Sequence, residues 1–356
     1  MKIGLKLFSA FKRVGQILSY AFHRNFLKRR GQLKFYALRE NGLFNGFNRL
    51  PDRMNIQLSK GILVNSKFSA GMTVSFATNA STINLRVLYK KKRLFQHMSR
   101  KASSGIDIYV KSKTTYRWIT CISPVSDGSM LAKETIHLNK GEKQIKLFLP
   151  PFAEIASIYV GINKSNSFQQ IPTLIDKPIL IYGSSITQGC AASRPSLSYT
   201  NLIARKLNRT IINMGFSESA KGEEELIRYL STLNPSVCII EYDHNASEDE
   251  LRLTHKSVYN IFRERNKDCL IIIMSRFSGG LSISQAEEQR RIDIIKETYD
   301  FAKNNGDMNI EVIYGNTFFQ NNREDYFVDD RHPNDLGMMA IAEAICSIIH
   351  KRGLDN

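Results

Sequence analysis

Cysteine is scarce in this sequence, and its distribution argues against two common kinds of stabilising site. The 356 residues contain five cysteines, an odd number, scattered without a C-x-x-C pair and without metal-ligand spacing against the seven histidines. A disulfide framework needs paired thiols, and a zinc site needs ligands at characteristic spacings. We therefore expect free cysteines that pack as small apolar residues, a reducing compartment, and no metal site.

Long apolar runs are also absent. No segment of the sequence reaches the roughly 20 apolar residues that a membrane-spanning helix needs. A secretory signal is disfavoured as well, because Lys12 and Arg13 interrupt the apolar segment near the N-terminus. These absences predict a cytoplasmic protein.

Acidic residues are missing before Glu40, and over the whole chain 50 Lys and Arg outnumber 33 Asp and Glu. In the first 34 residues, basic side chains alternate with apolar ones at helical spacing, namely Ile3, Leu7, Phe11, Val14, Leu18 and Phe22. This pattern predicts a basic amphipathic helix over residues 1–34. The helix either lies on an anionic membrane surface, at the inner face of the cell membrane, or packs on the protein with its basic face in solvent.

A second basic cluster, Lys90 to Arg93, carries no interleaved aromatic residues and matches no nucleic-acid-binding module. We expect this cluster to be a solvated loop, and we expect no nucleic-acid partner. We therefore relate the excess of positive charge to the basic helix expected over residues 1–34.

The sequence that follows, residues 35–168, has the pattern of a β-sandwich. Apolar residues alternate with polar ones in short runs around Val74, Ile83, Ile106 and Ile145, and turn signals such as Asp127-Gly128 separate the runs. Period-two alternation with frequent turns is typical of antiparallel strands that bury one face. The polar segment 163–167 is the expected linker to the next domain.

From residue 169 to residue 356 the pattern changes. Continuous apolar runs alternate with amphipathic helical segments; the runs are 179–182, 211–212, 237–240, 270–274 and 310–314. Strands that are apolar on both faces predict a parallel sheet with helices on each side. This is a doubly wound α/β domain.

Polar residues follow the ends of the first three runs and precede the last helix. They are Ser184-Ser185, residues 213–218, residues 241–245 and residues 329–333. In a doubly wound sheet these loops converge on one edge, outside the carboxyl ends of the strands. Acyl transfer needs a nucleophile, a base, an acid that orients the base, and donors for an oxyanion, and these loops offer all four.

The motifs G-S-S-I-T-Q-G, N-x-G-F-S, Y-D-H-N-A and D-x-x-H-P-N-D-L-G occur in this order between residues 178 and 349. In that order they resemble the SGNH (GDSL-like) hydrolases. Upstream, residues 49–51, 69–72 and 104–109 resemble the β-sandwich domain that precedes the hydrolase in one bacterial branch of this family. The resemblance implies a flavodoxin-like three-layer α/β/α hydrolase domain behind a jelly-roll-like sandwich.

The resemblance also implies the catalytic residues. Ser185 matches the nucleophile, His332 the general base, and Asp329 the carboxylate that orients it. Asp330 is the alternative orienting acid. Ser184 occupies the position that the family usually fills with aspartate.

Three groups match the oxyanion hole: the backbone N–H of Ser185, the side chain of Asn245, and the backbone N–H of Glu218. The family normally has glycine where this chain has Glu218. Three readings follow from this difference: an active enzyme whose Glu218 side chain turns outward, a changed substrate preference, or a degenerate site.

Three further residues lie in the expected site region. Arg194, His244 and Arg276 either contact the substrate or make structural hydrogen bonds.

The residues and the resemblance together favour a serine esterase that removes small acyl groups, such as acetyl, from a carbohydrate or another small molecule. No metal or organic cofactor is needed. Two alternatives use the same fold: an O-acyltransferase in surface-polysaccharide assembly, and a catalytically weakened protein that binds carbohydrate or membrane.

Overall fold

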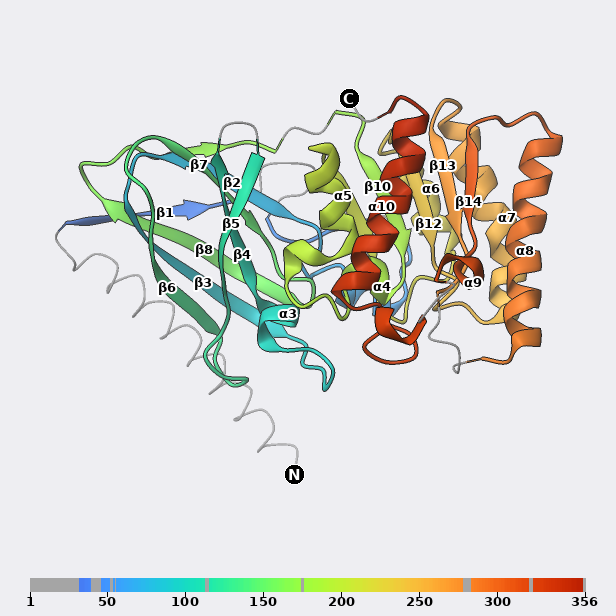
Figure 1. Cartoon of the computed structure of the whole chain (residues 1–356), viewed down its shortest axis with the longest axis horizontal. Helices are drawn as coiled ribbons and strands as arrows, with labels where there is room; N and C mark the ends of the chain where they lie inside the picture. The colour runs from blue at the N-terminus through green and yellow to red at the C-terminus, as the bar shows by residue number, and fades with distance from the viewer. Residues whose placement is uncertain are drawn as a thin grey trace.

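The computed structural model describes residues 32–39, 46–51, 54, 56–112, 115–173, 176–277, 283–319 and 323–354. Figure 1 shows a β-rich domain on the left and an α/β domain on the right. Most of residues 1–34, for which the sequence predicts a basic helix, lie outside the described residues, and Leu33 and Lys34 begin strand β1 (Leu33–Leu38). None of the helices in the described ranges is both long and apolar enough to cross a membrane.

The N-terminal domain is a sandwich of two antiparallel sheets, as predicted. One sheet has the order β1-β8-β3-β6, with β8 at Ala153–Asn163, β3 at Thr82–Lys92 and β6 at Leu131–His137. The other has the order β5-β4-β7-β2-β9, with strands at Thr115–Ile122, Ile106–Ser112, Lys143–Phe148, Thr73–Thr78 and Gln169–Ile171. Alternate residues of β3, such as Ile83, Leu85 and Val87, are buried between the sheets. The period-two pattern therefore identifies the buried face of β2 and β3 correctly.

The last sandwich strand, β9, pairs with β2 and ends at Ile171. The connection to the α/β domain thus runs between Ile171 and Ile179, after the polar segment 163–167. That segment is the turn between β8 and β9.

The C-terminal domain is built on a parallel sheet of order β11-β10-β12-β13-β14. Its strands are β10 (Ile179–Gly183), β11 (Ile211–Gly215), β12 (Val237–Glu241), β13 (Leu270–Met274) and β14 (Ile310–Ile313). In sequence this is the flavodoxin-like order 2-1-3-4-5, so the predicted fold class is confirmed. The strand order changes direction at β10, which is where a doubly wound sheet places its ligand site.

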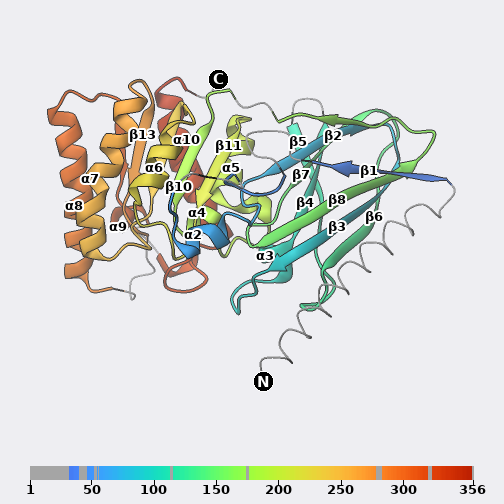
Figure 2. The same cartoon turned by 180° about the vertical axis from the view of Figure 1, so that it is seen from behind.

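Helices cover both faces of this sheet. On one face lie α5 (Tyr199–Leu207) and α10 (Asp335–Lys351), in front of the strands in Figure 1. On the other lie α6 (Glu224–Ser231), α7 (Glu248–Arg265) and α8 (Gln285–Asn304), seen from behind in Figure 2. The short helices are α2 (Lys60–Asn65), α3 (Arg100–Ser104), α4 (Ser185–Gln188), α9 (Gly315–Phe318) and the 3-10 turns Pro195–Leu197 and Arg323–Tyr326.

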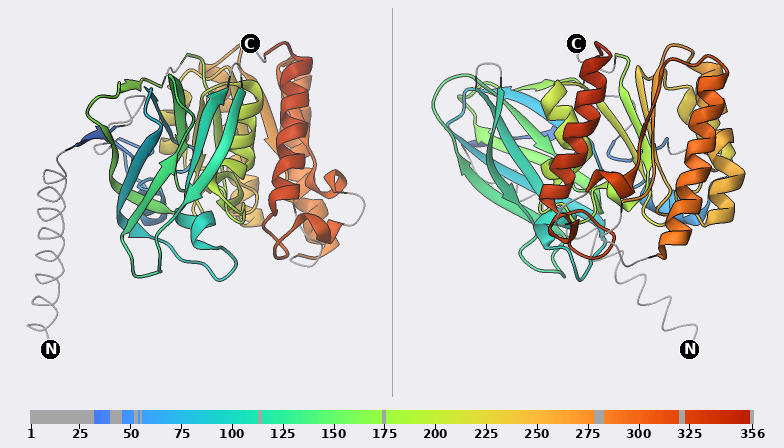
Figure 3. Two further views of the ribbon diagram at one scale, coloured as in Figure 1. Left: turned by 60° about the vertical axis from the view of Figure 1, so that its left-hand side comes forward. Right: turned by 45° about the vertical axis from the view of Figure 1, so that its right-hand side comes forward.

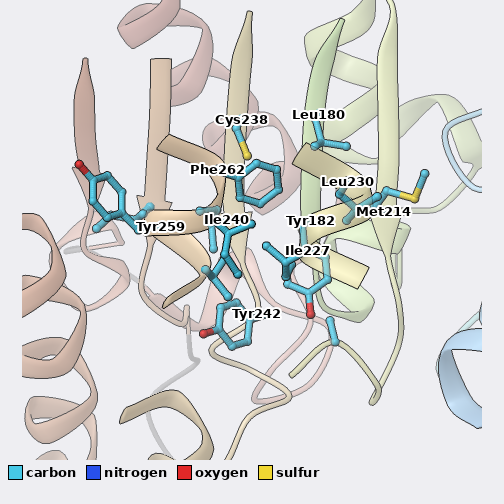
Figure 4. Close-up of a cluster of buried hydrophobic side chains, with 14 of the residues drawn as sticks. Leu180, Tyr182, Met214, Ile227, Leu230, Cys238, Ile240, Tyr242, Tyr259 and Phe262 are labelled. Atoms are coloured by element: carbon cyan, nitrogen blue, oxygen red, sulfur yellow. The ribbon is translucent and has the colours of Figure 1, made fainter. Parts of the chain in front are cut away.

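Figure 4 shows the core between the sheet and the α6–α8 layer. Leu180 and Ile240 from the strands pack with Ile227 of α6 and Phe262 of α7. All five residues of β10, β11, β12 and β13 are buried, which explains why these segments are continuously apolar in sequence. This core fixes the strand ends from which the candidate site is built.

Arg49 joins the two domains. Its guanidinium is buried and donates hydrogen bonds to the carbonyl oxygens of Asn65 and Phe68 on one side, and of Asn213 and Gly215 at the end of β11 on the other. The distances are 2.7 to 3.0 Å. The sandwich is therefore tied directly to the carboxyl edge of the sheet.

Candidate active site

The turn after β10 presents Ser185 at the carboxyl edge of the sheet. Ser184 caps the short helix α4, because its Oγ accepts a hydrogen bond from the N–H of Ile186 at 3.1 Å. A Cβ added at Gly183 would lie 2.2 Å from Thr187 Oγ1 and 2.8 Å from the carbonyl oxygen of Glu241. Only glycine fits there, so the strand can turn sharply into α4 and place Ser185 at its first position.

A buried carboxylate supports this turn. Glu241, at the end of β12, accepts hydrogen bonds from the Ser184 hydroxyl at 2.9 Å, the Ser184 N–H at 3.2 Å and the Thr187 hydroxyl at 2.7 Å. Burial raises the pKa of Glu241 to about 7, although the hydrogen bonds from Thr187 and Ser184 oppose that rise. Sequence reasoning missed this role, although a glutamate ending an apolar strand was a visible signal. An aspartate at position 184 would set a second carboxylate against Glu241.

Ser185, His332 and Asp329 form a continuous hydrogen-bonded chain. Ser185 Oγ lies 3.0 Å from His332 Nε2, and His332 Nδ1 lies 2.9 Å from Asp329 Oδ2. The other carboxylate oxygen of Asp329 accepts the backbone N–H groups of Arg331 and His332 at 2.8 and 2.7 Å. The D-x-x-H loop thus folds back on itself. The fold also brings together Ser185 and His332, which are 147 positions apart in the sequence.

The electrostatics of this chain favour a neutral histidine and an ionised aspartate. Burial lowers the pKa of His332, and the hydrogen bond and charge of Asp329 partly offset that effect. Burial also works against ionisation of Asp329, but hydrogen bonds from the His332 side chain and from two backbone N–H groups outweigh it and lower its pKa to about 2. His332 can therefore accept a proton near neutral pH while Asp329 stabilises the resulting imidazolium.

Glu218 has the backbone conformation of the glycine that it replaces. Its φ of +61° lies in the left-handed region, which side chains with a Cβ adopt at a cost of roughly 1–2 kcal/mol. Its carboxylate is 74% exposed and pairs with Arg93 of the sandwich domain at 3.1 Å. The Glu218 side chain therefore points into solvent. This is the outward orientation that the sequence analysis associated with an active enzyme.

Asn245 lies beside the Glu218 turn. Its Nδ2 donates to the carbonyl oxygen of Phe216 at 2.9 Å, and the N–H of Phe216 donates to the carbonyl oxygen of Gly183 at 2.8 Å. An amide carries two N–H bonds, so the second remains a potential donor to substrate. The loops after β10, β11 and β12 are thus contiguous, as the strand order requires.

The three candidate substrate contacts are placed differently. Arg194 lies at the domain boundary, where its guanidinium pairs with Asp107 at 3.2 Å and covers the ring of Trp118. Its role in substrate binding stays a prediction.

His244 and Arg276 are both buried. His244 Nε2 accepts the N–H of Phe277 at 3.0 Å, and burial, followed by the positive charges of Arg276 and His332, lowers its pKa. The backbone N–H of Arg276 donates to Asp243 at 2.8 Å. A substrate contact by either residue also stays a prediction.

A segment of the sandwich domain reaches the candidate catalytic residues, which the sequence did not reveal. We call residues 93–99, between β3 and α3, the β3–α3 arm. Its His97 ring lies 5.2 Å from the His332 ring, centroid to centroid, with 10° between the planes, and its Arg93 holds Glu218. Figure 3 shows the β-rich domain, coloured blue to green, packed against the α/β domain, coloured yellow-green to red, from two further sides. The expectation of a solvated loop at residues 90–93 was wrong, because Lys90–Lys92 belong to β3 and Arg93 pairs across the domain boundary.

A cavity of about 670 Å³ also lies between the domains, alongside β11. It is lined by Thr210 and Ile211, at the start of β11, and by Lys146 and Arg205. Ser185, Asp329 and His332 do not line this cavity, so it is separate from the candidate active site.

Two family models match consecutive parts of the chain. A model described as the GDSL-like Lipase/Acylhydrolase family matches residues 176–350, and one described as the N-terminus of Esterase_SGNH_hydro-type matches residues 29–168. A search of curated protein sequences gives no match.

Several solved structures share the whole two-domain fold. A protein described as a GDSL-like lipase from Bacteroides ovatus is 23% identical with a TM-score of 0.81, covering 90% of this chain and 98% of its own. A salicylyl-acyltransferase from a tetracycline biosynthetic pathway is 16% identical with a TM-score of 0.71, covering 91% and 95%. A family two carbohydrate esterase from Clostridium thermocellum is 16% identical with a TM-score of 0.57, covering 80% and 94%.

Proposed function

Because the chain belongs to the GDSL-like lipase/acylhydrolase family of ester-hydrolysing enzymes, we propose that it is a serine esterase that removes small acyl groups from a carbohydrate. The observation that carries this proposal is the chain of hydrogen bonds from Ser185 through His332 to Asp329. We propose acetyl as the acyl group and an acyl-enzyme on Ser185 as the intermediate.

In the proposed first step, Ser185 Oγ attacks the ester carbonyl and its proton passes to His332 Nε2. Asp329 holds the imidazole and stabilises its positive charge. The tetrahedral intermediate collapses, and the leaving sugar alcohol takes the proton from His332. A water molecule then attacks the acyl-enzyme with His332 again as the base, which releases the carboxylic acid and restores Ser185.

The oxyanion of each tetrahedral intermediate needs donors in place before it forms. We propose the N–H groups of Ser185 and Glu218 and the Nδ2 of Asn245 for this role. Two features of Glu218 support it: the left-handed backbone leaves the turn as a glycine would form it, and the exposed carboxylate pairs with Arg93 instead of facing the oxyanion. A missing donor in such a hole costs about 3–4 kcal/mol of transition-state stabilisation.

The carbohydrate substrate is supported by likeness in fold. The structures of similar fold include the Clostridium thermocellum carbohydrate esterase and an acetyl xylan esterase from Butyrivibrio proteoclasticus, which has a TM-score of 0.55. Both names describe esterases that act on sugars. We carry that substrate class to this chain as part of the proposal.

A second candidate is acyl transfer to an alcohol acceptor in place of water. The fold of the salicylyl-acyltransferase favours it, and the triad would work unchanged because only the second nucleophile differs. Incubating the enzyme with an acetylated donor and a range of sugars separates the two candidates. Acetylated acceptor forming faster than free acetate would establish transfer, and free acetate alone would establish hydrolysis.

The central test is labelling with a fluorophosphonate, which reacts with an activated serine. We expect the wild-type protein to gain one adduct, and peptide mapping to place it on the peptide that contains Ser185. Ser185→Ala should remain unlabelled and should hydrolyse acetylated sugars at least about 10⁴-fold more slowly. A folded wild-type protein that takes no label, or a Ser185→Ala variant that does, would contradict the mechanism.

We also propose that residues 1–34 bind an anionic membrane surface, although most of them lie outside the described residues. Liposomes containing anionic lipid should sediment the full chain at low salt and release it at high salt. A chain that lacks residues 1–31, which leaves β1 whole, should stay in solution. Equal sedimentation of both forms would exclude this segment as the anchor.

A further inference from the structure

The candidate active site contains a second cluster of reactive side chains, in which two residues that the proposed hydrolysis does not use, His97 and Cys190, lie beside His332. His97 of the β3–α3 arm, Cys190 and His332 each place one ligand atom within 4.8 Å of the other two. His97 Nε2 lies 3.3 Å from Cys190 Sγ, and the His97 and His332 rings face each other at 5.2 Å. The cluster therefore combines a residue of the sandwich domain, a residue of the loop after the nucleophile, and the candidate base.

Two imidazoles and one thiol are the ligands that zinc prefers. Zn²⁺ binds nitrogen at about 2.0–2.1 Å and thiolate sulfur at about 2.3 Å in a tetrahedral arrangement, so its ligand atoms lie about 3.3–3.8 Å apart. The distance from His97 to Cys190 already falls in that range. Because the two rings are nearly parallel, binding of one ion by both requires the His97 ring to rotate, and its half-buried place on a loop allows this.

We propose that His97, Cys190 and His332 form an inhibitory site for Zn²⁺. This inference rests on the proposed role of His332 as the catalytic base. The ion would take the three side chains and one water molecule as ligands, with the thiol proton released to solvent. A soft thiolate with two imidazoles selects zinc over magnesium or calcium.

Zinc would inhibit hydrolysis because it would bind a ring nitrogen of His332 that already has a partner in the proposed triad. Its Nε2 faces Ser185 and its Nδ1 faces Asp329, so both nitrogens belong to the triad. Whichever nitrogen binds the ion, the triad loses either the base that activates Ser185 or the contact that orients it. Zinc and ester hydrolysis therefore compete for one side chain.

The site also depends on contact between the domains. His97 reaches His332 only because the β3–α3 arm lies against the catalytic loops, where Arg93 pairs with Glu218. Neither domain alone carries all three ligands. Zinc would thus bind only to the assembled two-domain protein.

Direct binding is measured first, by isothermal titration of ZnCl₂ into the full chain. We expect one ion per molecule, with affinity at least tenfold weaker in His97→Gln and in Cys190→Ser. Cys346→Ser is the matched control, since Cys346 lies on α10 away from the triad and should leave binding unchanged. His97→Gln changes a partly exposed loop residue, so it keeps the test valid even if Cys190→Ser does not fold.

Cobalt provides a spectroscopic test of the ligands. Co²⁺ in the same site should show a thiolate-to-metal charge-transfer band that is absent in Cys190→Ser. Ser185→Ala keeps all three ligands and should bind both metals like the wild type, although it cannot hydrolyse esters. Metal binding is therefore tested whether or not the proposed esterase activity is found.

Inhibition is measured as the ratio of hydrolysis rates with and without zinc within each variant. We expect micromolar ZnCl₂ to slow the wild-type enzyme at least tenfold, chelator to restore the rate, and His97→Gln to need at least tenfold more zinc. Equal zinc affinity in the wild type, His97→Gln and Cys190→Ser, or cobalt binding without the thiolate band, would overturn the proposal.

Discussion

At the scale of single residues, the substitution of glutamate for glycine at position 218 is the point at which this chain departs most from its family pattern. The structure accommodates it by keeping a φ of +61° and turning the carboxylate into solvent toward Arg93. The departure therefore concerns backbone strain more than charge in the oxyanion hole. When glycine is restored at position 218, relief of backbone strain and loss of favourable terms have opposite effects on stability.

We expect Glu218→Gly to change kcat/KM by less than about threefold and the free energy of unfolding by less than about 1 kcal/mol. Glycine removes about 1–2 kcal/mol of left-handed strain but adds backbone entropy to the unfolded chain and loses an exposed ion pair. Steady-state kinetics on an acetylated sugar and urea unfolding measure the two effects. A rise in kcat/KM of tenfold or more would mean that Glu218 impairs the hole after all.

The residue before the nucleophile offers a second test. We expect Ser184→Asp, which introduces the family's usual aspartate, to destabilise the protein by about 3 kcal/mol or more, because it places a second carboxylate against buried Glu241. Urea unfolding at pH 8 measures the loss. The loss should be smaller at pH 5, where the carboxyl groups can be protonated. A Ser184→Asp protein as stable as the wild type would show that Glu241 does not restrict this position.

We expect the pH dependence of activity to follow the titration of His332, the proposed base. Its pKa is lowered by burial, so kcat/KM should rise with pH to a plateau whose midpoint lies below 6.5, the ordinary value for histidine. In Asp329→Asn the carboxylate that raises this pKa is gone. The midpoint should move to still lower pH while the plateau falls by about 10⁴-fold. A midpoint that moves upward would contradict the assignment of Asp329 as the orienting acid, and Asp330→Asn serves as the matched control.

At the scale of elements, the β3–α3 arm is the part of the sandwich domain that contributes to the site. His97 packs against the base, and Arg93 holds the Glu218 turn. The pair of rings is worth about 0.5–1.5 kcal/mol, whereas the exposed ion pair is worth at most about 1 kcal/mol. The two contacts are therefore of similar strength.

We expect His97→Ala to lower kcat/KM by about three- to tenfold, with little change in the unfolding temperature, because the arm is at the surface and only the support of His332 is lost. Leu94→Ala is the matched control: Leu94 lies on the same arm, is 51% exposed, and should have no effect. Kinetics without zinc, in the presence of a chelator, separate this effect from metal inhibition. Equal activity of His97→Ala and Leu94→Ala would exclude a positioning role.

At the scale of the whole molecule, Arg49 couples the two domains. It is 1% exposed, and its side chain donates hydrogen bonds to carbonyl oxygens of both domains. Replacing the guanidinium therefore leaves several buried carbonyl oxygens without a donor. We expect Arg49→Met to destabilise the protein by about 3–5 kcal/mol. Calorimetry should also resolve two unfolding transitions where the wild type has one. A single transition at the wild-type temperature would show that other contacts hold the domains together.

The sequence was most informative where local chemistry dictates structure. Alternating residues such as Ile83, Leu85 and Val87 specify a strand with one buried face, and the continuous run from Ile179 to Tyr182 specifies a strand buried on both. Fold class follows from these periods. The resemblance to the family motifs then indicated Ser185, His332 and Asp329 as candidates, and the D-x-x-H spacing lets Asp329 fold back onto His332.

Only the tertiary structure decided which distant residues meet. Glu241 supports the nucleophile turn because β12 lies next to β10, and His97 reaches His332 because the sandwich packs against the catalytic edge. No spacing in the sequence signals either contact, nor the cluster of His97, Cys190 and His332, since its members lie far apart in the chain. The outward turn of Glu218 was likewise decided by Arg93, a residue of the other domain. Periodicity reports which faces are buried, but contacts between domains arise from packing that leaves no local pattern.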